Sequence, residues 1–114
     1  MLKTRDNGHV MPPRAFFQER QFAAAVAEVE RMLRPEVQRI RYTIGEDWSG
    51  DPAVFFRIVI SEDFSSRDQI RKVSSHVKTT LREQIEPVEQ WGVRPYFNFR
   101  SQSEQAVLQD EAWA

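Results

Sequence analysis

Arginine and aromatic residues recur in three short segments of this chain, in a pattern that could bind another macromolecule. Guanidinium groups donate paired hydrogen bonds to carboxylates and phosphates, whereas aromatic rings stack on nucleobases or fill pockets in a protein partner. If the segments are extended, these side chains share one face, because alternate residues of a strand point the same way. The predicted interaction face comprises Arg39, Arg41, Phe55, Arg57, Val59, Arg94, Tyr96, Asn98 and Arg100.

Alternating hydrophobicity predicts the three strands that would position this face. Residues 37–45, 53–61 and 93–100 each alternate apolar side chains with the face residues. Residues 46–52 between the first two are rich in turn formers, so we expect an antiparallel hairpin there. Trp48 in this loop is a further candidate contact, and Pro95 favours an edge position for the third strand.

Helical spacing of apolar residues predicts two helices that would cover the other face of the sheet. The first spans residues 14–34 and is ended by Pro35. Ser66 and Gln69 fit a capping box at the start of the second, and Pro87 ends it. The inward-facing residues are Phe22, Val26, Val29 and Leu33 in the first helix, and Ile70, Val73, Val77, Leu81 and Ile85 in the second.

The order helix, strand, strand, helix, strand predicts an α+β two-layer sandwich. Two helices lie on one face of a three-stranded mixed sheet, and a short C-terminal helix is an option. The length of 114 residues suits one domain. We predict a flexible N-terminal arm in residues 1–13, a single α+β domain in residues 14–102, and a tail or short helix in residues 103–114 that docks on the domain or on a partner.

This element order resembles, in topology, the type II KH domains that bind RNA and the cytoplasmic dimerisation domain of cation-efflux transporters. The KH resemblance implies a GXXG loop, which the glycines at positions 8, 45, 50 and 92 do not form. The transporter resemblance implies clustered histidine and carboxylate ligands, and His9 and His76 do not supply such a cluster. We therefore assign the chain to no family, because shared topology alone does not define function.

Composition argues against several function classes. The chain has no cysteine, which excludes disulfides and thiol catalysis. We expect a cytoplasmic protein with no membrane segment, because no apolar run is long enough. The formal charge of −1 means that affinity for nucleic acid would depend on local clustering. The acidic loop at residues 46–51 lacks the ligand spacing of an EF-hand, and no catalytic motif occurs, so we predict no metal, no cofactor and no enzymatic activity.

Three occupants of the arginine and aromatic face remain open. A protein partner or a second copy would use residue types that are enriched at interfaces. Single-stranded RNA or DNA is the alternative. The third occupant is the tail itself, with Leu108 and Trp113 filling the apolar centre and Glu104, Asp110 and Glu111 lying across the sheet. We predict a small non-catalytic interaction or regulatory module of a bacterial type, homodimeric and adaptor-like or antitoxin-like.

Overall fold

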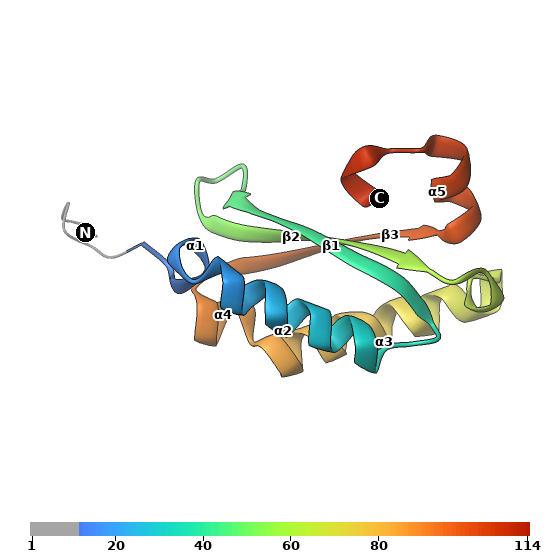
Figure 1. Ribbon diagram of the computed structural model, residues 1–114, viewed down its shortest axis with the longest axis horizontal. Coiled ribbons are helices and arrows are strands. Elements are labelled where there is room, and N and C mark those ends of the chain that lie inside the picture. The colour runs from blue at the N-terminus through green and yellow to red at the C-terminus, as the bar shows by residue number, and fades with distance from the viewer. Residues whose placement is uncertain (1–11) are drawn as a thin grey trace.

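A three-stranded mixed sheet forms one layer of the structure and helices form the other, which confirms the predicted α+β two-layer sandwich (Figure 1). The structure is a computed structural model that describes residues 12–114. The predicted arm, residues 1–13, therefore lies outside the described residues except for its last two. The strands are β1 (Val37–Glu46), β2 (Pro52–Ile60) and β3 (Arg94–Ser101). The helices are α1 (Arg14–Phe17), α2 (Glu19–Met32), α3 (Arg67–Ile85), α4 (Pro87–Trp91) and α5 (Gln102–Leu108), with short 3-10 turns η1 (Glu62–Phe64) and η2 (Glu111–Trp113).

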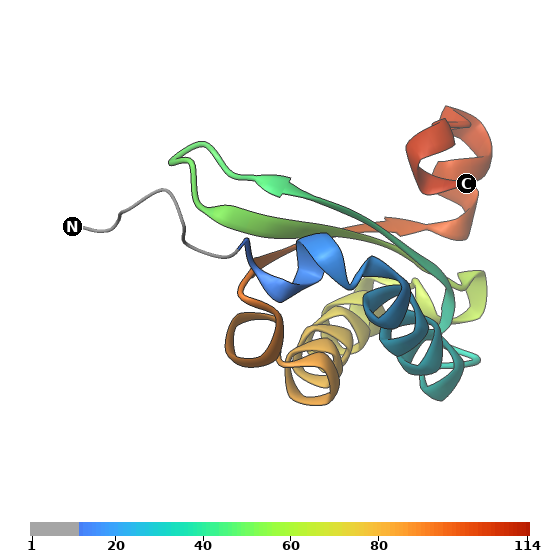
Figure 2. The same cartoon turned by 60° about the vertical axis from the view of Figure 1, so that its left-hand side comes forward.

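Strand β2 lies in the centre of the sheet. It pairs antiparallel with β1, as the predicted hairpin requires, and parallel with β3, so that β3 is an edge strand. The parallel pairing needs a crossover, which α3 and α4 provide on one face of the sheet. Figure 2 shows α2 and α3 together below the strands, while the C-terminal segment lies above them. The two faces of the sheet therefore have different coverings.

The hydrophobic core lies between the helices and the sheet. Phe22 of α2 is fully buried, and its ring packs edge-on against Tyr42 and Trp91, with centroid distances of 5.0 and 5.1 Å. A third neighbour, Phe56 of β2, is also fully buried and stacks at 6.3 Å. One side chain of α2 thus joins β1, β2 and α4. The other fully buried residues of the helix and sheet layers include Val54, Ile58, Ile60, Val77 and Leu81.

Two predicted helix boundaries differ from the structure. The helix predicted for residues 14–34 is interrupted at Gln18, whose φ of −121° and ψ of 44° are not helical. This break lets α1 turn toward α4, where the Arg14 guanidinium lies 3.9 Å from the ring centre of Trp91. At the other boundary, the chain leaves α3 through Glu86, which has a left-handed φ of 54°, and Pro87 begins α4 rather than closing α3. Proline is favoured at the first position of a helix, because the N–H group that proline lacks would have no hydrogen-bond partner within the helix there.

The start of α3 follows the sequence-based expectation more closely. The Ser66 side chain accepts a hydrogen bond from the backbone N–H of Gln69, so it caps the helix. Gly92 ends α4 with a φ of 70°, and a Cβ at this position would lie 3.1 Å from Pro13. Both the positive φ and this close approach favour glycine. Within residues 12–114, none of the helices combines the length and the hydrophobicity that spanning a bilayer requires.

We expect Phe22→Ala to lower the free energy of unfolding by about 3–5 kcal/mol, because it leaves a cavity where four elements meet. Phe17→Ala is the matched control, since Phe17 is 53% exposed on α1. The control should change stability by only about 0.5 kcal/mol. Urea unfolding followed by circular dichroism measures both variants, and equal losses would contradict this assignment of the core.

Candidate interaction face

Strand register brings the predicted face residues together on the side of the sheet opposite α2 and α3. Cross-strand partners form four rows: Ala53 with Arg94; Thr43, Phe55 and Tyr96; Arg41, Arg57 and Asn98; and Arg39, Val59 and Arg100. The first two rows lie next to the loop that joins β1 to β2, and we call them, together with Trp48, the hairpin end. The last two rows lie at the other end, which we call the tail end.

The C-terminal segment of the chain covers the tail end. Trp113 of η2 is 7% exposed, and the Arg100 guanidinium lies 4.2 Å from the centre of its ring. Val59, which was predicted to be available to a partner, is fully buried. Leu108, by contrast, is exposed and does not fill the apolar centre as expected. The tail therefore docks on its own domain through one aromatic residue.

Three arginines hold the main chain of this segment. The Nε atoms of Arg39, Arg41 and Arg57 donate hydrogen bonds to main-chain oxygen atoms of Trp113, Ala114 and Ala112, at 2.8, 2.6 and 2.6 Å. Hydrogen bonds from a charged donor are stronger than those between neutral groups. Because the acceptors are backbone atoms, the acidic side chains predicted to lie across the sheet have a smaller part. Of the three acidic residues predicted to lie across the sheet, Glu104, Asp110 and Glu111, only Asp110 pairs with an arginine of the face. Its carboxylate lies 3.5 Å from Arg100.

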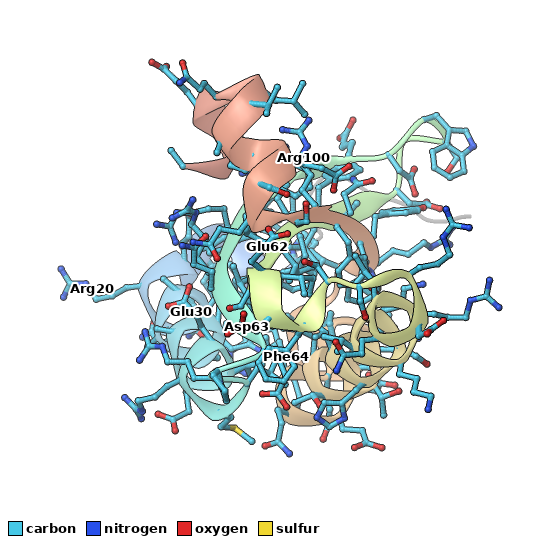
Figure 3. The ribbon with its side chains drawn as sticks, turned by 90° about the vertical axis from the view of Figure 1, so that its right-hand side faces the viewer. Arg20, Glu30, Glu62, Asp63, Phe64 and Arg100 are labelled. Atoms are coloured by element: carbon cyan, nitrogen blue, oxygen red, sulfur yellow. The ribbon has the colours of Figure 1, made fainter. Side chains whose placement is uncertain are left out.

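Helix α5 brings the tail back over the sheet. Ser101 and Glu104 form a capping box at its start, and Glu62 of η1 accepts a hydrogen bond from the backbone N–H of Ser103 at 2.9 Å. In Figure 3, Arg100 lies between α5 and the strands, and Glu62 lies near the junction of β3 with α5. Gln105 is buried, accepts from Arg100 at 3.0 Å and donates to the carbonyl of Asp110 at 2.8 Å. These contacts fix the direction in which the chain leaves α5.

Three aromatic rings form a cluster at the hairpin end. The rings of Phe55 and Tyr96 are stacked with centroids 5.3 Å apart, and Trp48 packs against Tyr96 at 5.5 Å. Trp48 is nevertheless 84% exposed. An exposed aromatic that is already supported by neighbouring rings loses little conformational freedom when it binds a partner.

A buried carboxylate holds the loop that carries Trp48. Asp47 accepts hydrogen bonds from the backbone N–H groups of Ser49 and Asp51, both at 3.0 Å, and from the hydroxyls of Ser49 and Tyr96, both at 2.7 Å. The hydroxyl of Ser49 and then that of Tyr96 hold the pKa of Asp47 well below its usual range. The hydrogen bond to Asp47 raises the pKa of Tyr96 in turn. Arg94 adds positive charge nearby, at 3.2 Å from Asp51.

All five predicted face arginines have an acceptor within the chain. Arg39 and Arg57 bind tail carbonyls, and Arg41 binds a tail carbonyl and lies 3.7 Å from Glu30. Arg94 faces the loop carboxylates and Arg100 faces Asp110. Asn98, the other polar residue of the predicted face, is an exposed member of the tail end. Each of the five guanidiniums therefore has an acceptor in the fold, and three of them, those of Arg41, Arg94 and Arg100, lie within 4 Å of a carboxylate.

Sequence reasoning missed Asp47, Gln105 and the tail carbonyls as members of this face. Asp47 was interpreted as an ordinary turn residue of the acidic loop, and its position four residues before Asp51 gave no sign of the bond to Tyr96. Backbone carbonyls have no signature in a sequence. Across residues 12–114, no three His, Asp or Glu side chains are grouped so that they could hold a metal ion.

The sequence matches no known protein family, and no curated protein is similar enough to it to count as a relative. The function of the chain must therefore be inferred from the geometry of the face.

Trp113→Ala should lower the free energy of unfolding by about 1.5–3 kcal/mol, the contribution expected for burying one large apolar side chain. Leu108→Ala in the same tail is the control, because Leu108 is exposed, and we expect a change of about 0.5 kcal/mol or less. Urea unfolding of both variants tests this difference. If Trp113→Ala is as stable as the wild-type chain, the tail does not dock on the sheet.

Asp47→Asn should destabilise the protein at neutral pH and much less in acid. The folded-state pKa of Asp47 lies below its unfolded value, so its stabilising effect is fully present above about pH 4 and is lost as the pH falls further. Unfolding free energies of the variant and the wild-type chain should therefore converge in acid. Asp63→Asn, at an exposed carboxylate in η1, controls for general charge effects, and a pH-independent difference at position 47 would refute the argument.

Proposed function

We propose that this chain is a non-catalytic protein-interaction module that binds a protein partner through the hairpin end of its sheet. The observation that carries the proposal is the position of Trp48, which is 84% exposed yet packed on Tyr96. Tryptophan, tyrosine and arginine are the residue types that contribute most to protein interfaces. Trp48, Tyr96 and Arg94 combine all three types at one end of the sheet.

Rigidity at the hairpin end supports this proposal. The Tyr96 hydroxyl is held by Asp47, and the backbone of the loop is closed by a hydrogen bond from the N–H of Asp47 to the carbonyl of Asp51 at 2.9 Å. A surface that is ordered before binding loses less entropy on association. The partner surface that fits it is an apolar pocket for the exposed Trp48 ring.

Single-stranded nucleic acid is the less favoured ligand, because its phosphates would have to compete with acceptors already in place. Arg39, Arg41 and Arg57 are bound to the tail, and Arg94 is bound to the loop. The stacked rings of Phe55 and Tyr96 could accept a base, but phosphates beside them would have to displace acceptors that these arginines already have.

Site-specific photocrosslinking in cells of the source organism tests the protein partner. A photoreactive phenylalanine analogue at position 48 should give a discrete crosslinked protein species. The same analogue at position 88 is the control, because Val88 is also an exposed apolar residue but lies on α4 in the helix layer. Crosslinks of equal yield at both positions, or none at position 48, would remove the support for this interface. A crosslink between two copies of the chain would identify the partner as a second copy, so that the complex is a homodimer.

Fluorescence anisotropy with labelled single-stranded RNA and DNA tests the alternative. We expect no saturable binding near physiological salt, because the five guanidiniums have intramolecular acceptors. Binding that weakens steeply with salt and disappears in Arg57→Glu would instead show a nucleic-acid platform and would overturn the proposal.

A further inference from the structure

The tail end of the sheet has the construction of a peptide-binding site, and the chain's own residues 110–114 occupy it. We propose that this site also takes residues 110–114 of a second copy, so that two chains associate by reciprocal exchange of their tails. This site lies at the opposite end of the face from Trp48, and the inference does not depend on the protein partner proposed above.

The contacts of residues 110–114 combine main-chain recognition with two side-chain anchors. Three arginine Nε atoms bind main-chain oxygen atoms of three consecutive residues, 112, 113 and 114, at 2.6–2.8 Å. Arg100 contacts both anchors, because it lies 3.5 Å from the Asp110 carboxylate and 4.2 Å from the ring centre of Trp113. An acidic residue followed three positions later by tryptophan is thus the chemistry that the site selects.

A second copy fits this site because it carries the same segment. Every contact that residues 110–114 make in one chain can be made again on the sheet of another, so an exchange conserves the contacts. The hydrogen bond from the Gln105 amide to the carbonyl of Asp110, at 2.8 Å, is formed again in the same way. What opposes exchange is the high effective concentration of a tail attached to its own domain.

Gln109 provides the point at which the tail can turn away. Its φ of 51° lies in the left-handed region, which residues other than glycine rarely adopt. A change at this residue moves residues 110–114 and leaves α5 in place, because α5 is held at its start by Ser101 and Glu62. Val107 and Leu108, both exposed on α5 just before this point, would then lie beside the second chain.

Complementation between two full-length variants tests the exchange under weakened competition from the attached tail. The acceptor is Trp113→Ala, which keeps the arginines but weakens its own tail. The donor carries Arg39→Ala with Arg57→Ala, which keeps the tail but weakens its own site. Sedimentation velocity of labelled acceptor should show a saturable heterodimer with the donor. The control is a donor that also carries Trp113→Ala, and it should form no heterodimer. An equal amount of heterodimer with both donors would overturn the exchange.

Two further measurements keep this test independent of other causes. Adding Trp48→Ala to both variants should leave the heterodimer unchanged, whereas loss of the heterodimer would assign the association to the hairpin end and overturn exchange of the tails.

A labelled peptide of residues 109–114, amidated at its C-terminus, should bind the acceptor saturably and the wild-type chain at least about tenfold more weakly, because the wild-type tail competes. The same peptide with alanine in place of the tryptophan should not bind. Absence of peptide binding to a folded acceptor would also overturn the proposal.

Discussion

The central strand β2 carries buried apolar side chains on both of its faces, and much of the structure depends on how they are covered. Val54, Phe56, Ile58 and Ile60 point toward the helices and are fully buried, yet Val59 on the other face is fully buried as well. In a two-layer sandwich, the helix layer covers only one face of the sheet. The C-terminal segment therefore acts as a partial third layer over the tail end, and the hairpin end is left open.

This division gives the same residue type two different roles. At the tail end, Arg39, Arg41 and Arg57 bind backbone carbonyls, so they hold a segment of chain in place. At the hairpin end, Arg94 faces the carboxylates of Asp47 and Asp51 and lies beside the aromatic stack. A cluster of arginines in a sequence thus indicates a binding surface without indicating whether its ligand lies in another molecule or in the same chain.

Much of the fold follows from local patterns that the sequence displays. Alternation in residues 37–45 and 53–61 predicts the hairpin, and Ser66 predicts the start of α3, because both depend on neighbouring residues. The break at Gln18 was missed because helix propensity continues through it, and only the packing of α1 against α4 favours it. The sequence allowed a docked tail as one of three possible occupants but did not favour it over the others. The hydrogen-bond acceptors of the tail are main-chain atoms, which a sequence does not distinguish. Its anchor, Trp113, lies 54 positions from Val59, so no local pattern connects the two residues.

The three tryptophans of the chain lie in three separate environments. Trp48 is exposed at the loop, Trp91 is buried where α4 meets the core, and Trp113 is buried under the tail beside Arg100. Indole emission shifts with the polarity of its surroundings, and a quencher in solution reaches only exposed rings. The protein thus carries its own spectroscopic probes, one for the open end of the sheet, one for the core and one for the docked tail.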